Sequence, residues 1–293
     1  GIMQRNQILG IACGLGAASI WGAMYVVSKV VLEVIPPFAL ITLRLLIGGL
    51  ALWALISMRG GLKISRVQFW QVGGVGVIGY GISLGLQFLG TKLSTAANGS
   101  LVTSATPAFV LLFAAWILRE RITRRRLFAL LLSTLGVIAV IDPRSTQLKS
   151  ELFIGNLALL GAALTWALYS VLIRVVTRSL DVLAVSLVAF LGGLAIVMPA
   201  GALELQHQVI GPVTPGVAAG VLFLGLIATA LAMVLWNTAF AVLDAGLASL
   251  TFFAQPVVGT LLGWFFLGER MTPLFILGGL LIGAGLAIAS RES

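Results

Sequence analysis

Long apolar runs separated by short polar segments dominate the chain. A helix needs about 20 mostly apolar residues to cross the hydrocarbon layer of a membrane. Outer-membrane strands would instead alternate in polarity over about ten residues, and a run such as FALLLSTLGVIAVI has no period of two. The pattern therefore predicts ten transmembrane helices, at residues 8–29, 37–57, 67–90, 95–118, 126–142, 152–174, 181–200, 215–240, 245–267 and 273–290.

The chain also contains two similar halves. GAASIWGAMYVVSKVV at 16–31 aligns with GAALTWALYSVLIRVV at 161–176, and SLVTSATPAFVLLFAAWILRERIT at 100–123 aligns with SLTFFAQPVVGTLLGWFFLGERMT at 249–272. These matches predict a duplicated unit of five helices, with repeats at 1–143 and 151–293 and a linker at 144–150. The internal copy also indicates that the first span is retained and is not a cleaved secretory signal.

An odd number of spans in each repeat fixes their relative direction, because the second repeat must enter the membrane from the opposite side. Inverted repeats are an architecture of transporters, in which a midplane site opens to either side of the membrane in turn. The alternative is a duplication in a purely structural membrane protein. We predict an all-α integral membrane protein whose ten transmembrane helices form two inverted five-helix repeats.

The composition agrees with a membrane protein and excludes several other classes. Of the 293 residues, 60% are hydrophobic and only 9% are charged, whereas soluble proteins carry about 25% charged residues. A soluble enzyme, a disordered chain and a disulfide scaffold are therefore disfavoured, the last because Cys13 is the single cysteine. The net charge of +9 lies in short clusters between apolar runs, which indicates membrane sidedness and no nucleic-acid partner.

The distribution of Lys and Arg predicts the orientation, because cytoplasmic loops hold the excess of these residues. With the amino terminus inside, 12 of the 18 Lys and Arg side chains lie in the cytoplasm, five lie outside and Arg44 lies within a span. We therefore expect a multi-pass inner-membrane protein with both termini in the cytoplasm.

Arg44 is the one charge placed well inside a span, about 10 Å from its outer end. Such an arginine normally faces the interior of the bundle or a wet cavity. It could hold the carboxylate of a substrate, or it could only fix the architecture, and the sequence leaves both interpretations open. The nine acidic residues fall at span ends or in loops, so no midplane carboxylate is available for exchange of cations against protons.

Aromatic, hydroxyl and amide side chains recur at helical spacing within the spans. Singly, such residues are more often packing residues or interhelical hydrogen bonds, but together they are typical of a mostly apolar small-molecule cavity with a few polar groups. The predicted binding residues are Trp21, Tyr25, Arg44, Tyr80, Ser83, Gln87, Asn98, Trp166, Tyr169, Trp236, Asn237, Phe252 and Gln255. The repeat-related Pro107 and Pro256 are interpreted either as hinges beside this cavity or as fixed kinks.

These features together resemble the EamA-type members of the drug/metabolite transporter superfamily. The likeness covers nearly the whole chain and rests on the repeat-related Trp21 and Trp166, on Arg44, and on the proline and Glu-Arg pairs of spans four and nine. It departs at Val188, which occupies the position corresponding to Arg44 in the second half. The resemblance implies carriage of small metabolites, and the branch that exports aromatic and other neutral amino acids is the nearest.

The predicted function is therefore export of small metabolites, above all aromatic and other neutral amino acids, by alternating access around a midplane cavity. ATP is not expected to be used, since no phosphate-binding GxxxxGK[ST] motif is present. Alternatives are efflux of drugs or other organic solutes, and less favourably nucleotide-sugar exchange or a channel. An enzyme is disfavoured because no Ser–His pair or Asp pair falls within the spans. We expect no cofactor and no metal, and a monomer or weak dimer whose partners are the small-molecule substrate and the bilayer.

Overall fold

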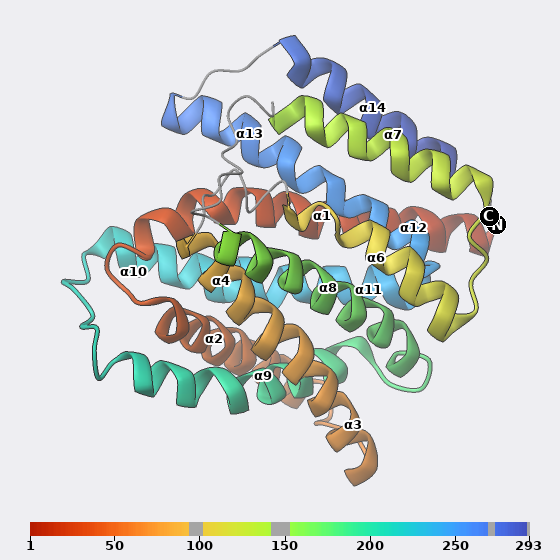
Figure 1. Cartoon of the computed structure of the whole chain (residues 1–293). Helices are drawn as coiled ribbons and strands as arrows, with labels where there is room; N and C mark the ends of the chain where they lie inside the picture. The colour runs from red at the N-terminus through yellow and green to blue at the C-terminus, as the bar shows by residue number, and fades with distance from the viewer. Residues whose placement is uncertain (94–101, 142–152, 269–272, 292–293) are drawn as a thin grey trace.

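The structure is a bundle of helices with both termini at the same end (Figure 1). This computed structural model describes residues 1–93, 102–141, 153–268 and 273–291, and every regular element in these ranges is helical. Gln7 donates from its amide nitrogen to the backbone carbonyl of Ser290 at 2.7 Å, which ties the first helix to the last. We call this the terminal end of the bundle, and the opposite end the far end. The predicted linker at 144–150 lies outside the described residues.

The first half contributes five helical segments, two of which are divided by a change of helix type. They are α1 (Ile2–Val31), α2 (Pro37–Met58), α3 with η1 and α4 (Arg66–Gly76, Val77–Ser83 and Leu84–Leu93), α6 with η2 (Thr106–Phe113 and Ala114–Leu118), and α7 (Arg124–Ile141).

The second half repeats this order of segments. They are α8 (Phe153–Val176), α9 (Val182–Glu204), α10 with η5 and α11 (Pro215–Leu222, Phe223–Leu231 and Ala232–Val242), α12 with η6 and α13 (Ala245–Leu250, Thr251–Phe253 and Ala254–Leu267), and α14 (Pro273–Ser290). Each of the ten predicted spans thus has a helical counterpart in the described part of the chain.

Local sequence sets where several of these helices begin. Ser65 and Gln68 form a reciprocal capping box at the start of α3. The side chains of Asp181 and Thr214 accept hydrogen bonds from the first turns of α9 and α10. Pro37 begins α2, where its missing N–H has no helical partner to lose.

Eight helical stretches in the described ranges are long and apolar enough to cross a membrane. They are Ile2–Val31, Pro37–Met58, Arg66–Leu93, Phe153–Val176, Val182–Glu204, Pro215–Val242, Ala245–Phe266 and Pro273–Ser290, and a shorter apolar helix covers Thr106–Leu118. α7 has a similar length but begins with three arginines, so its apolar part is shorter. Its position in the bundle, against α14, is that of the fifth predicted span.

The packing of the helices follows a twofold pattern. α1 packs on α11 and α13, while α8, its repeat counterpart, packs on α4 and α6. α2 packs on η5, and its counterpart α9 packs on η1. Two helices also contact their own counterparts, α2 with α9 and α7 with α14. Exchanging these helices for their counterparts therefore reproduces the main contacts.

The two repeats run in opposite directions through the bundle. α1 begins at the terminal end, where Gly10 lies against Leu243, whereas α8 ends there, with Arg174 donating to the carbonyl of Ala241 at 2.8 Å. At the far end α2 begins and α9 ends, because Glu204 of α9 accepts hydrogen bonds from the first backbone amides of α2 at 3.1 and 3.2 Å. The repeats are inverted, as the sequence predicts.

Each of the two repeat-related prolines lies just after a change in the helical geometry of its span. Pro107 lies in the first turn of α6, directly after a turn at 104–105, and Pro256 is the third residue of α13, directly after the short 3-10 segment η6. Proline cannot bond the carbonyl four residues earlier, and Thr106 donates its hydroxyl to that carbonyl of Thr103 at 2.7 Å. Whether these positions move during transport stays a prediction.

Candidate functional site

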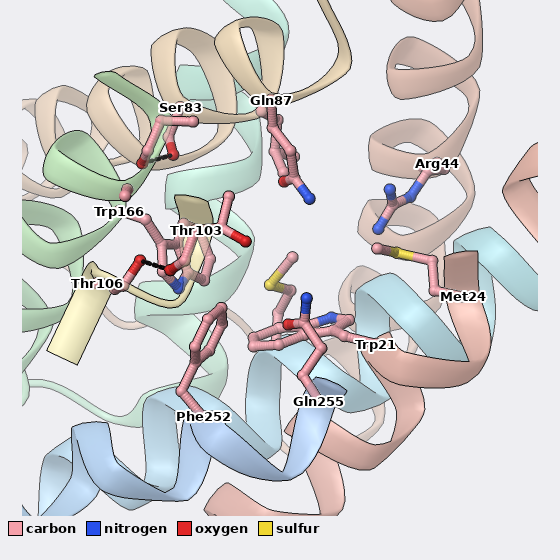
Figure 2. Close-up of a pocket in the computed structure, with 14 residues that line it drawn as sticks. Trp21, Met24, Arg44, Ser83, Gln87, Thr103, Thr106, Trp166, Phe252 and Gln255 are labelled. Carbon is pink, nitrogen blue, oxygen red and sulfur yellow. Dashed lines mark hydrogen bonds between the residues drawn. The ribbon is translucent and has the colours of Figure 1, made fainter. Parts of the chain in front are cut away.

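A central cavity of about 40 Å³ lies between the two halves (Figure 2). Seven of the predicted binding residues line it: Trp21, Arg44, Ser83, Gln87, Trp166, Phe252 and Gln255. The other lining residues include Met24, Thr103, Thr106 and Met233. Met24 and Met233 each lie three residues from a predicted tryptophan, but apolar methionines in apolar spans give no distinguishing signal in the sequence.

Two long π-helical segments related by the repeat, η1 and η5, lie at or next to the cavity. η1 carries Ser83, whose hydroxyl donates to the carbonyl of Ala162 at 2.9 Å. η5 carries Thr229, whose hydroxyl donates to the carbonyl of Leu224 at 2.7 Å and supports Arg44. The wider turns of a π-helix change the direction of side chains and leave some backbone groups without helical partners, and they recur at functional sites.

Arg44 is the charged group of the cavity, and it is almost completely buried, with 1% of its surface exposed. Its Nε donates to the hydroxyl of Thr229 at 3.0 Å, and its guanidinium carbon lies 5.9 Å from the centre of the Phe88 ring. The two terminal nitrogens have no hydrogen-bond partner among the described residues. A guanidinium presents a planar fork that matches a carboxylate, so the free edge of Arg44 can bind an anionic group.

Aromatic rings form the opposite wall of the cavity. The indole rings of Trp21 and Trp166 meet edge to face at 5.7 Å, and Trp236 lies behind both, at 5.3 and 6.4 Å. The indole N–H of Trp21 donates to the carbonyl of Ala228 at 3.0 Å, and that of Trp236 donates to Ser170 at 3.0 Å. Because these two donors are satisfied, the rings of Trp21 and Trp236 are held in place, and Trp21 offers mainly apolar surface to the cavity.

Two amides and a hydroxyl connect the halves next to the cavity. Gln87 of α4 and Gln255 of α13 both donate their amide nitrogens to the hydroxyl oxygen of Tyr25, at 3.0 and 2.9 Å. Thr103 also hydrogen-bonds the Tyr25 side chain. Tyr25 itself lines the neighbouring cleft and not the central cavity.

Four predicted binding residues lie behind the cavity wall. Tyr80 and Tyr169 share a short hydrogen bond between their hydroxyls, and Tyr169 donates to the side-chain oxygen of Asn237 at 2.9 Å. Asn237 donates to Ser186 at 2.9 Å, and the indole of Trp236 is fully buried beside this chain. In this conformation these groups bond one another, and direct binding by them stays a prediction. Asn98 lies outside the described residues.

A larger cleft of about 440 Å³ opens at the far end of the bundle. Charged Lys29, Glu33 and Lys92 line its mouth, and its inner end shares Met24 and Gln87 with the central cavity. These two side chains therefore separate the cavity from a wide opening.

At the terminal end, charged side chains join the two halves. Arg126 contacts Asp244 at 2.8 Å and Glu120 at 3.6 Å, and Arg174 lies 4.0 Å from Asp244. Glu120 also accepts hydrogen bonds from the first two backbone amides of α12, at 2.8 and 3.2 Å. We call these four residues the ion cluster. It connects α7 and the end of η2 to α8 and α12 at this end of the bundle.

The described residues contain no grouping of three or more His, Cys, Asp or Glu side chains that could hold a metal ion.

Comparisons with known proteins give a consistent result. The model of the EamA-like transporter family matches residues 8–141 and 153–291. The chain is 25% identical over 286 residues to the uncharacterized transporter YoaV of Bacillus subtilis, covering 95% of this chain and 94% of that protein. It is 24% identical over 277 residues to an uncharacterized transporter of Archaeoglobus fulgidus, covering 93% and 94%.

A further relative carries a more specific name. The chain is 25% identical over 284 residues to a probable amino-acid metabolite efflux pump of Salmonella typhimurium, covering 92% of this chain and 90% of that protein. A solved crystal structure has the same fold, with a TM-score of 0.84 and 24% identity over 97% of this chain and 99% of that one.

Proposed function

The chain belongs to the EamA-like transporter family, and from that premise we propose that it exports amino acids, with aromatic and other neutral ones preferred. In this proposal the substrate binds in the central cavity, and the protein alternates between states open to either side. No ATP is used, and the net direction of flux follows the substrate gradient, because binding alone can only shift the balance between states.

Arg44 is the observation that carries the substrate assignment. A buried guanidinium with two unpartnered terminal nitrogens is costly unless an anion completes its hydrogen bonds. A substrate carboxylate supplies that anion. An organic cation would meet an uncompensated positive charge in the same cavity, which disfavours the drug-cation alternative. A diphosphate would favour several cations, and Arg44 is the only one among the residues lining the cavity.

The aromatic wall supports the preference for apolar and aromatic side chains. Trp21, Trp166 and Phe252 offer apolar faces to the cavity, and aromatic pairs gain about 0.5–1.5 kcal/mol beyond their buried area. The name of the Salmonella relative, a probable amino-acid metabolite efflux pump, points to the same substrate class.

The state of the bundle supports alternating access. A cavity of about 40 Å³ holds only a few water molecules, so an amino acid requires movement of Met24 and Gln87, which separate it from the cleft. With the predicted orientation, the cleft faces the outside and the ion cluster faces the cytoplasm of a cell with an inner membrane. We therefore assign this conformation to an outward-facing state with a constricted site.

Counterflow in liposomes tests the proposal. Purified protein is reconstituted into vesicles preloaded with unlabelled phenylalanine, and uptake of labelled Phe, Trp, Met and Thr is measured without ATP, with protein-free vesicles as the control. Labelled tetraphenylphosphonium and a labelled nucleotide sugar are tested in parallel. We expect uptake of Phe and Trp above the control. Uptake of only the cation or only the nucleotide sugar would overturn the substrate assignment.

Cysteine labelling tests the orientation. In a Cys13→Ser background, Ser65→Cys in the α2–α3 loop and His207→Cys in the α9–α10 loop are treated in intact cells with a membrane-impermeant thiol reagent. We expect reaction at position 207 and protection at position 65. The reverse pattern would place the termini outside.

A further inference from the structure

Two amide side chains, those of Gln87 and Gln255, line the central cavity. Gln87 and Gln255 each use their amide nitrogen to donate to the hydroxyl of Tyr25, which turns each carbonyl oxygen away from that hydroxyl. Both side chains line the cavity, and Gln255 is 4% exposed. Neither oxygen accepts a hydrogen bond from any described residue. The cavity therefore contains acceptors as well as the free donors of Arg44.

The two amide groups come from opposite halves, and their nitrogens both donate to the hydroxyl of Tyr25. Gln87 lies on α4 in the first repeat and Gln255 lies on α13 in the second, while Tyr25 of α1 holds both amides in place. In Figure 2 their amide groups lie on the side of the cavity toward Arg44, away from the ring of Trp166. The small volume of the cavity keeps the acceptors and the guanidinium within the reach of one small molecule.

The chemistry of these groups matches a zwitterion. A carboxylate can fill the fork of Arg44, but it offers nothing to the two amide oxygens, because it has no donor. A primary ammonium group has three donors and no acceptor. In an α-amino acid the two groups are attached to one carbon, so the carboxylate can face Arg44 while the ammonium faces the amides. The side chain then extends toward the aromatic wall.

We propose that the amide oxygens of Gln87 and Gln255 bind the α-ammonium group of the substrate, so that the site selects α-amino acids against carboxylic acids that lack the amine. This inference rests on the proposed function. Binding sites built to hydrogen-bond a polar group reject analogues without it, since their own buried polar groups are then left unpaired. The selection therefore operates even where the carboxylate and the aromatic ring are unchanged.

Competition by matched ligands tests this subsite in the wild-type protein. Counterflow of labelled phenylalanine is inhibited with unlabelled phenylalanine, 3-phenylpropanoate, N-acetylphenylalanine and phenethylamine. The first two share the ring and the carboxylate and differ in the ammonium. We expect phenylalanine to inhibit at a concentration at least about tenfold lower than 3-phenylpropanoate or N-acetylphenylalanine. Equal inhibition by phenylalanine and 3-phenylpropanoate would overturn the subsite.

Variants locate the selection on the two amides. Gln87→Met and Gln255→Met remove the acceptor and keep a side chain of similar length, and Gln208→Met in the cleft is the matched control. We expect each cavity variant to lower the preference for phenylalanine over 3-phenylpropanoate by about tenfold, while the control keeps it. An unchanged preference in both cavity variants would overturn the assignment. If the two variants fail to fold, the wild-type ligand series alone decides.

The outcomes separate this inference from the proposed function. Transport of phenylalanine with no discrimination against 3-phenylpropanoate overturns the ammonium subsite and leaves an amino-acid carrier. Absence of any amino-acid counterflow overturns the proposed function, and the subsite falls with it.

Discussion

Replacing Arg44 with methionine separates a binding role from an architectural one. Met has a similar length and no charge. If the guanidinium only supports the bundle, its loss removes the hydrogen bond to Thr229 and destabilises the fold. If it binds substrate, the fold persists and transport is lost. Placing an Arg at the centre of a membrane span costs about 2.5–3.5 kcal/mol, whereas one ordinary hydrogen bond contributes about 1 kcal/mol. We therefore expect the Met variant to be at least as stable as the wild type.

The expected loss of binding follows from the two free nitrogens. Hydrogen bonds to charged groups contribute about 1.5–3 kcal/mol each, so a carboxylate held by both terminal nitrogens of Arg44 gains about 3–6 kcal/mol. This corresponds to a decrease in affinity of about a hundredfold to ten-thousandfold. Arg44→Lys keeps the charge but lacks the planar fork, and we expect an intermediate decrease.

Two measurements are needed for this test. Counterflow of labelled phenylalanine gives the apparent affinity, and thermal unfolding in detergent gives the stability of the same preparations. Normal transport by the Met variant would refute the binding role of Arg44. Unfolding of the variant at a clearly lower temperature would instead support a purely structural role.

Further predictions concern the interface of α3 with α9 and the ion cluster. Gly76→Ala would place its Cβ 2.0 Å from the carbonyl oxygen of Ala189, so we expect the protein to be destabilised by about 1–3 kcal/mol in thermal unfolding. The matched change Gly74→Ala meets nothing within 4 Å, and we expect it to be neutral or slightly stabilising. Asp244→Asn removes the carboxylate charge that both arginines of the ion cluster approach. We expect it to increase, several-fold, the rate at which an impermeant thiol reagent applied at the terminal end modifies Ser83→Cys; an unchanged rate would show that the cluster does not hold that end closed.

The sequence could predict the number, order and inversion of the helices because these follow from apolar length and from internal similarity. A span must be long and apolar, and an odd number of spans in a repeat forces inversion. The placement of Arg44 in a cavity also followed from the cost of an isolated charge in lipid. The edge-to-face contact of Trp21 with Trp166 agrees with their repeat-related positions at mid-span.

Depth within the bundle could not be predicted from helical spacing. Tyr169 shares a helix face with Trp166, yet Trp166 lines the cavity while Tyr169 is completely buried in a hydrogen-bonded chain with Asn237. Spacing of three or four residues identifies a face of a helix, but neighbouring helices decide which part of that face meets open space. The π-helical segments had no recognisable signal either, and they determine how Ser83 and Thr229 are aimed.

The most direct test of the account is whether one central residue can be reached from both sides of the membrane. Ser83→Cys in a Cys13→Ser background places a single thiol in the cavity wall. In oriented membrane preparations, an impermeant thiol reagent is applied to one face or to the other, with and without saturating phenylalanine. The account predicts modification from each face and a lower rate from both when phenylalanine is bound. Modification from one face only, under every condition, would contradict alternating access through this cavity.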